Sequence, residues 1–244
     1  MASAADAAPS FLYLPRLAGS PDTFVLGEED ARYVSRVVRA KPGERLTASD
    51  GAGCVAELVI ETVRPDVFVR VAHRARAAES APRVLLCGAP EGERGDWMVE
   101  KCAELGVTRF VPVHTERVRW PEGTRVERWS RLAVAALRQS QAARLMGVES
   151  PVSLQEAVGT LAAGVRWLAD ATGTPALETG APVDTAIAGA VGPSSGFSVE
   201  ELKCLADNGF LPIGLASSRL RTETAAVALA SIWAAHGLHA RPGA

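Results

Sequence analysis

The strongest constraint on the fold is the alternation of short apolar runs with helical segments beyond residue 82. Apolar runs occupy 84–87, 110–113, 165–168 and 188–191, and helical patterns occupy 96–105, 126–144, 153–161, 198–208 and 223–236. Strands that alternate with helices form parallel sheets with helices on both faces. The sequence therefore predicts an α/β fold whose ligands bind at the loops after the carboxyl ends of the strands.

The first part of the chain has a different pattern, in which short apolar runs are separated by turns. The runs at 24–26, 54–60 and 67–71 are separated by glycine- and proline-containing sequences, which are typical of antiparallel strands. One helix is predicted from Glu28 to Arg39, with Ala31, Val34 and Val38 on its apolar face. These features predict a small β-barrel that carries one helix.

The change of pattern predicts the domain boundaries. Residues 1–10 are small and polar, and such a segment is expected to be disordered because it cannot bury enough apolar surface. The barrel is assigned to residues 11–73 and the α/β domain to residues 83–244. Residues 74–82 show no periodicity and are interpreted as a linker.

Composition excludes several classes of protein. The chain has 244 residues and 4 cysteines, and these form no C-x-x-C pair. The cysteines are expected to be small buried hydrophobes, and neither a disulfide framework nor a metal site is expected. No apolar run approaches the roughly 18 residues that cross a bilayer, so we expect a cytoplasmic protein with no membrane partner.

The net charge of -2 would ordinarily argue against a nucleic-acid partner. The charge is unevenly distributed, however, because residues 105–148 contain eight arginines and three glutamates. Residues 151–244 contain five basic and eight acidic residues. The basic stretch could hold phosphates on one side of the molecule, although a solvated helix face is an equal alternative for residues 125–138.

Two loops of the α/β part carry signals for ligand binding. Residues 192–197 (GPSSGF) follow an apolar run and precede residues 198–201 (SVEE), a capping box that opens a helix. Glycines at such a turn let backbone N–H groups approach a ligand, although an ordinary connecting turn is the alternative. The second loop contains Arg219 and Arg221, and their guanidinium groups suit phosphate, carboxylate or base edges. Thr222 is predicted to cap the last helix.

Several segments together resemble the RsmE family of SPOUT RNA methyltransferases. The family patterns are K-G-x-R-x-[DE]-x-x-x-x-K-x-x-E-L-G-V, E-Q-S-x-R, G-P-E-G-G-[FL]-[ST]-x-x-E and L-G-x-x-[IV]-L-R-T-E-T-A. Similar sequences occur in this order at 91–107, 138–144, 192–201 and 215–225, and residues 32–51 are similar to the family's PUA-like N-terminal domain. The resemblance thus covers nearly the whole chain.

The resemblance implies a fold and an activity. It implies a PUA-like β-barrel followed by a SPOUT α/β domain with a parallel sheet and a trefoil knot. It also implies an S-adenosylmethionine-dependent methyltransferase that modifies N3 of a specific uridine in 16S (small-subunit) rRNA within the assembled small subunit. The enzyme would be a homodimer that needs no metal and does not act on DNA.

The resemblance also assigns functional residues. The donor pocket would contain Gly192, Pro193, Gly196, Leu215, Ala216, Leu220, Arg221 and Thr222. Five arginines are assigned to RNA binding: Arg36, Arg39, Arg94, Arg117 and Arg144. Arg221 is the candidate catalytic cation beside the uracil oxygens, and Glu223 would either orient Arg221 or accept the N3 proton.

The chain departs from the family patterns at three places. Ser194 and Ser195 stand where the pattern has Glu-Gly, residues 215–219 (LASSR) replace L-G-x-x-[IV], and Glu91 replaces a lysine. These departures motivate an alternative, a SPOUT-fold RNA-binding protein with impaired or lost catalysis. A third hypothesis, an α/β metabolic enzyme whose loops bind another anion, predicts indifference to RNA.

Overall fold

The computed structural model describes residues 10–90, 93–121, 123, 126–180 and 185–238. Residues 1–9 of the segment predicted to be disordered, together with Glu91, lie outside the described residues. The chain forms two compact units. The first unit comprises the chain up to Glu79 together with Leu137–Leu145, and the second comprises Ser80–Ala136 and the chain from Met146 onward.

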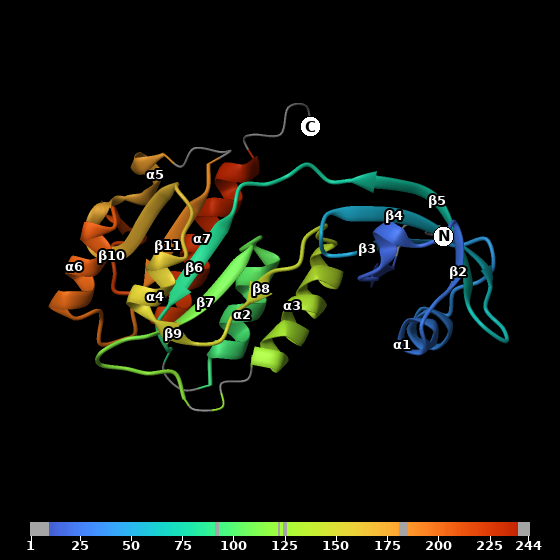
Figure 1. The fold of residues 1–244 in the computed structure, drawn as a ribbon, viewed down its shortest axis with the longest axis horizontal. Helices are drawn as coiled ribbons and strands as arrows, with labels where there is room; N and C mark the ends of the chain where they lie inside the picture. The colour runs from blue at the N-terminus through green and yellow to red at the C-terminus, as the bar shows by residue number, and fades with distance from the viewer. Residues whose placement is uncertain (1–9, 91–92, 122, 124–125, 181–184, 239–244) are drawn as a thin grey trace, which may run out of the picture. The chain divides into compact units, whose positions relative to one another are not determined.

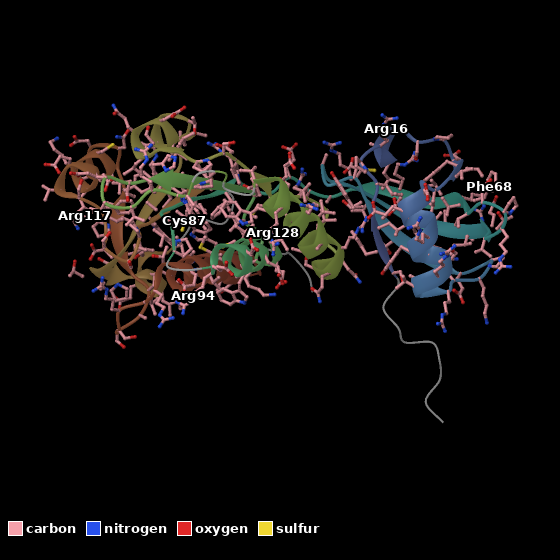
Figure 2. The ribbon with its side chains drawn as sticks, turned by 90° about the horizontal axis from the view of Figure 1, so that it is seen from below. Arg16, Phe68, Cys87, Arg94, Arg117 and Arg128 are labelled. Carbon is pink, nitrogen blue, oxygen red and sulfur yellow. The ribbon has the colours of Figure 1, made fainter. Side chains whose placement is uncertain are left out.

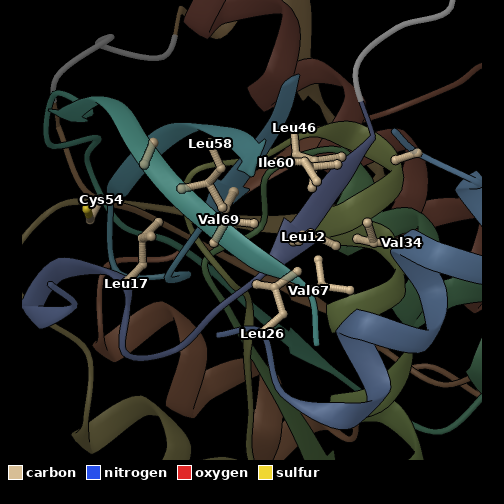
Figure 3. Packing of buried hydrophobic residues seen from close by; sticks show 13 residues of the cluster. Leu12, Leu17, Leu26, Val34, Leu46, Cys54, Leu58, Ile60, Val67 and Val69 are labelled. Carbon is tan, nitrogen blue, oxygen red and sulfur yellow. The ribbon is translucent and has the colours of Figure 1, made fainter. Parts of the chain in front are cut away.

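The first unit is built on a five-stranded sheet in the order β1-β3-β4-β5-β2 (Figure 1). Its strands are β1 (Phe11–Tyr13), β2 (Thr23–Val25), β3 (Arg45–Ser49), β4 (Cys54–Thr62) and β5 (Phe68–Arg76). The β1–β3 pair is parallel and the other pairs are antiparallel. Alternate residues of β4, namely Ala56, Leu58 and Ile60, are buried in the core of this unit. Figure 3 shows Leu58 and Ile60 among the packed side chains.

The helix predicted over residues 28–39 is present as α1 (Glu28–Arg32), which continues into a π-helical turn, η2 (Tyr33–Val38). Val34 is buried in the core, and Ala31 and Val38 pack against it. The apolar face was therefore assigned correctly from its spacing.

Strand β5 extends further than its sequence indicates. Ala75 and Arg76 pair with Val55 and Cys54 of β4, so the first three residues of the predicted linker 74–82 lie in a strand. This extension depends on pairing with β4, and the alternating arginines and alanines of this segment give no apolar signal for it.

The second unit is built on a seven-stranded sheet in the order β12-β10-β11-β6-β7-β8, with β9 paired to β7 (Figure 1). Its strands are β6 (Arg83–Cys87), β7 (Arg109–His114), β8 (Gly147–Val148), β9 (Val152–Ser153), β10 (Val165–Pro175), β11 (Ile187–Val191) and β12 (Leu211–Gly214). All of the strand pairs are parallel. The predicted α/β fold with a parallel sheet is therefore confirmed.

Helices cover both faces of this sheet. They are α2 (Gly95–Glu104), α3 (Val126–Ser140), α4 (Leu154–Gly159), α5 (Ala176–Thr179), α6 (Val199–Asp207) and α7 (Thr222–Leu238). In β11, Ala188 and Ala190 pack in a cluster with residues of α4 and α6, whereas Gly189 faces α7. None of the described helices has the length and apolar character needed to span a membrane.

Helix α3 ends at Ser140, four residues earlier than the predicted helix at 126–144. Gln141 adopts a left-handed φ of 54°, and the Leu145 N–H then donates to the Gly51 carbonyl within the first unit. The sequence after Ser140 remains compatible with a helix. The early end of α3 therefore depends on this long-range contact, which the sequence pattern does not indicate.

Gly189 allows α7 to lie close against β11. A Cβ on Gly189 would lie 2.4 Å from Leu229 Cδ2 and 2.7 Å from Trp233 Cζ2. We expect Gly189→Ala to lower the free energy of unfolding by about 2 kcal/mol, because the helix must shift to admit the methyl group. Urea denaturation measures the change. Gly159→Ala is the control, since among the described residues no atom outside its own stretch of helix lies within 4 Å of the new Cβ. Equal urea midpoints for the two variants would refute the prediction.

Candidate functional site

The loop after β11, residues 192–197, forms a tight turn that leads into α6. The Gly196 N–H donates to the Pro193 carbonyl at 2.8 Å, and Gly196 has a φ of 72°. Glycine suits this position because a Cβ makes such a φ unfavourable. The predicted capping box is present, because Ser198 Oγ accepts from the Glu201 N–H and the Glu201 carboxylate accepts from the Ser198 N–H.

The loop after β12, residues 215–221, is joined to the first loop by a side chain. Thr222 Oγ1 donates to the Gly192 carbonyl at 3.0 Å, and Thr222 is buried. Thr222 is already the first residue of α7, so its hydroxyl links the two loops instead of forming the predicted helix cap. The loops that follow β11 and β12, two strands on either side of β10, are therefore joined by a hydrogen bond.

A cavity of about 450 Å³ lies among these two loops and residues 168–171 of β10. Its size is typical of a small-molecule site. Seven of the residues predicted to bind the donor line it: Gly192, Pro193, Gly196, Leu215, Ala216, Leu220 and Thr222. The eighth, Arg221, lines the two pockets that adjoin this cavity.

The cavity wall includes two charged residues that the predicted donor pocket lacked, and of these only Arg219 was indicated by the sequence as a possible ligand contact. Among the described residues that line it, Asp170 is the only acidic one and Arg219 the only basic one. Asp170 Oδ1 accepts hydrogen bonds from the Thr172 N–H and hydroxyl, so the loop fixes its carboxylate. A carboxylate just beyond the apolar run 165–168 was the available signal, because ligands bind at the carboxyl ends of such strands.

Arg221 lines an adjoining open pocket of about 600 Å³ together with Arg94, Trp97 and Glu223. Arg94 Nη1 donates to Glu223 Oε1 at 2.9 Å. The Glu223 side chain is only 7% exposed, whereas that of Arg94 is 44% exposed. The partner of Glu223 in the structure is thus Arg94 and not Arg221, which corrects the expectation that Glu223 orients Arg221.

The N-terminus of α2 fixes the position of Arg94. Asp96 accepts a hydrogen bond from Trp129 Nε1 at 2.8 Å and forms an ion pair with Arg128 Nε at 2.6 Å. Trp129 also packs edge-to-face against Trp120, whose Nε1 donates to the Cys87 carbonyl. Both tryptophans are buried, so they serve as packing groups, and the charge and ring contacts together hold the helix start.

Two thiols lie beneath this site but are not nucleophiles. Burial raises the pKa of Cys102 to about 12, and it also holds the pKa of the buried Cys87 well above its usual range, with smaller contributions from Cys102 and Glu223. Cys87 Sγ lies 3.7 Å from Met98 Sδ. Since the thiolate is the reactive form, both groups are inert packing residues.

We expect a thiol reagent at pH 8 to leave Cys87 and Cys102 unmodified in the folded protein. The raised pKa keeps each thiol protonated at this pH, and burial blocks access. Peptide mass spectrometry after alkylation measures the labelling, with the urea-unfolded chain as the control that reacts at both positions. Labelling of either residue before unfolding would contradict this assignment.

The five arginines predicted to bind RNA lie in both units. Arg36 and Arg39 are exposed in and just after η2. Arg144 donates to the carbonyls of Ala52, Ala77 and Ala78, so its guanidinium connects separate segments of the first unit. Arg94 and Arg117 belong to the second unit (Figure 2), where Arg117 Nη1 donates to the Ser195 carbonyl at 2.8 Å. Two of the five therefore bond to main-chain carbonyls, a use that their sequence context did not indicate.

The described residues contain no group of three or more His, Cys, Asp or Glu side chains that could hold a metal ion. The site thus offers guanidinium groups, one paired carboxylate and main-chain groups around adjoining cavities. The cavities can hold an organic ligand, and the guanidinium and main-chain groups can bind a second molecule that is anionic or forms hydrogen bonds.

Comparison with known proteins identifies the family. The family model of the RNA methyltransferase domain matches residues 78–234. A Mycobacterium tuberculosis protein named ribosomal RNA small subunit methyltransferase E is 32% identical over 232 residues, which cover 87% of each chain. A relative of the same name from Synechocystis is 27% identical over 91% of this chain and 78% of its own.

Solved structures agree with these sequence matches. A probable rRNA-methyltransferase from Porphyromonas gingivalis has a TM-score of 0.81 and 29% identity, with 95% of this chain and 100% of that chain covered. A Legionella pneumophila methyltransferase, solved in complex with the bound cofactor S-adenosylmethionine, has a TM-score of 0.78 and 27% identity, with 94% and 98% covered. The chain therefore belongs to the RNA methyltransferase family that includes the ribosomal RNA small subunit methyltransferase E proteins.

Proposed function

We propose that this RNA methyltransferase transfers a methyl group from S-adenosylmethionine to N3 of a specific uridine in 16S rRNA of the assembled small subunit. The observation that carries the proposal is the donor-sized cavity between the two loops and its junction with the pockets of Arg94, Arg221 and Glu223. The names of the relatives, and the S-adenosylmethionine bound to the Legionella protein, support the substrate and the donor.

The cavity has suitable chemistry for this donor. S-adenosylmethionine supplies a methyl group on a positively charged sulfur, and its amino-acid end carries one carboxylate and one ammonium group. The wall of the cavity is largely apolar but includes Asp170 and Arg219, one charge of each sign. Main-chain groups of the loop at 192–197 complete the wall, as is usual for a site that fixes a few polar atoms within an apolar lining.

Methylation at uridine N3 requires loss of the N3 proton to solvent water and stabilisation of the resulting anion. The N3–carbon bond forms as the carbon–sulfur bond breaks, so N3 must lie in line with both atoms. Arg221 lines both adjoining pockets and is the proposed donor to the uracil oxygens, where negative charge develops. Glu223 is proposed to hold Arg94 as a second cation there, because its carboxylate already accepts the Arg94 guanidinium.

The altered residues of the first loop are compatible with a working site. Among the described non-glycine residues, only Arg39 and Gln141 have a positive φ, so Ser195 is not strained where the pattern has glycine. Gly196 keeps the positive φ that the turn requires. Ala216 lines the cavity without closing it. These observations favour the enzyme over the alternative of an RNA-binding protein that has lost catalysis.

The remaining features of the proposed enzyme concern its assembly. We propose that residues 11–73 form a PUA-like RNA-binding domain and that residues 83–244 form a SPOUT domain with a trefoil knot, in a cytoplasmic homodimer. Helix α7 supports a dimer because it is apolar around its circumference, and Val227, Ala228 and Ile232 are only half-buried within one chain. Arg36 and Arg39 are the proposed RNA contacts of the first unit.

A methyl-transfer assay tests the proposal directly. Purified protein, tritiated S-adenosylmethionine and small subunits that lack the modification are expected to give labelled 3-methyluridine in 16S rRNA. Calorimetry with S-adenosylhomocysteine separates the alternatives, because a lost donor site should give no heat of binding. Donor binding without any labelled uridine would reject the proposed reaction.

A further inference from the structure

Three carbonyl groups of the turn after β11 accept hydrogen bonds from side chains of two other segments of the chain. Arg219 Nη2 donates to the Ser194 carbonyl, and Arg117 Nη1 donates to the Ser195 carbonyl. Thr222 Oγ1 donates to the Gly192 carbonyl of the same turn. Arg219 and Thr222 follow β12, whereas Arg117 follows β7, so one short turn is attached to two separate parts of the chain.

Arg219 occupies a central place among the cavities. It lines the donor cavity and both of the pockets that adjoin it. The donor cavity has residues 192–197 on one side and residues 215–222 on the other. The contact from Arg219 to Ser194 therefore links the two loops that line the donor cavity.

Arg219 departs from the family pattern described above. Arg219 stands where the family pattern has isoleucine or valine, and an aliphatic side chain cannot donate to a carbonyl. Ser194 stands where the pattern has glutamate, so both residues of the contact depart from the pattern. The two departures from the pattern are in contact, because Arg219 donates a hydrogen bond to the carbonyl of Ser194.

We infer that Arg219 is a positioning residue whose hydrogen bond to the Ser194 carbonyl holds the turn at residues 194–195 against the donor cavity and slows donor release. Arg117 stabilises the same turn through its hydrogen bond to the Ser195 carbonyl. The inference rests on the proposed use of S-adenosylmethionine. A hydrogen bond from a charged donor stabilises the closed arrangement of the loops, so its loss should increase the rate at which the cavity opens. Arg219 acts through the turn, and no part of the reaction is assigned to it.

The test compares three variants of the full-length protein. Arg219→Ile introduces the residue type of the family pattern, and Arg219→Lys keeps a cationic donor. Arg166→Ala is the matched control, because Arg166 Nη1 also donates to a main-chain carbonyl, that of Asn208, but lines none of the three cavities. Calorimetry gives the Kd for S-adenosylhomocysteine, stopped-flow fluorescence gives its dissociation rate, and thermal melting confirms folding.

We expect Arg219→Ile to raise both the Kd and the dissociation rate about tenfold, in keeping with the loss of one charge-assisted hydrogen bond. Arg219→Lys should recover most of the loss, and Arg166→Ala should match the wild type. In the transfer assay, Arg219→Ile should raise the KM for the donor more than it lowers kcat, with the KM for the small subunit unchanged.

Two results would overturn the inference. Wild-type donor affinity in Arg219→Ile would show that the hydrogen bond from Arg219 to Ser194 does not affect donor binding. An increase in the KM for the small subunit alone would assign Arg219 to RNA. Failure of the proposed donor gives a different result, since the wild-type protein would then bind no S-adenosylhomocysteine, and failure of the proposed reaction alone would leave donor binding intact but give no labelled uridine.

Discussion

Replacement of Arg221 with alanine is expected to lower the rate of methyl transfer by a factor of about 10³, the upper end of the range for loss of one donor to a developing oxyanion. Arg221 is exposed and lines both pockets beside the donor cavity. Its guanidinium has no hydrogen-bond partner among the described residues, so it is available to a substrate. Single-turnover transfer to undermethylated small subunits measures the effect.

The same substitution should leave the fold nearly unchanged. An exposed side chain outside the core contributes within about 0.5 kcal/mol, which corresponds to a melting temperature within about 2 °C of the wild type. Arg221→Lys is the control, because it keeps the charge but loses the fork of donors and should recover only part of the rate. A large fall in the melting temperature of Arg221→Ala would assign Arg221 a structural role instead.

Replacement of Arg94 with alanine is expected to affect both stability and activity. The change leaves the carboxylate of Glu223, which is only 7% exposed, without its guanidinium partner. An uncompensated buried charge is costly, and because Arg94 is itself 44% exposed we expect a loss of about 2 kcal/mol of unfolding free energy. Transfer should fall about a hundredfold, because Arg94 also lines the pocket of Arg221.

A double-mutant cycle with Glu223→Gln identifies the origin of this loss. If the unpaired carboxylate is responsible, Glu223→Gln should restore part of the stability of Arg94→Ala but none of its activity. Arg32→Ala is the control, because Arg32 pairs with Glu28 at 2.8 Å on an exposed helix and should cost less than about 0.5 kcal/mol. Additive effects of Arg94→Ala and Glu223→Gln on stability would show that the pair is not coupled.

Much of the second unit could be predicted from local patterns. The apolar runs at 84–87 and 188–191 became neighbouring strands β6 and β11, and the capping box at Ser198 formed as its spacing requires. These features depend on residues that lie within a few positions of one another. The resemblance to a family then located the two loops, and seven of its eight proposed donor residues lie around one cavity.

Contacts between distant segments could not be predicted in this way. The pair of Arg94 and Glu223 joins residues 129 positions apart, and no local pattern indicates it. The same holds for Arg144, whose guanidinium is directed to the carbonyls of Ala52 and Ala77 in the first unit. Each of these arginines looks like an available surface cation when only its sequence neighbours are considered.

The sequence by itself determined most of the longer strands and helices, the α/β class and the positions of the two loops, because periodicity and turn chemistry act over short distances. The tertiary structure decided which charges are available to a ligand. It paired Glu223 with Arg94, directed Arg117 and Arg219 to the turn after β11, and left Arg221 facing the pockets. The physical reason is that a guanidinium bonds to whichever acceptor the fold brings within reach, and the fold brings together loops, such as those after β7 and β11, that lie far apart in the sequence.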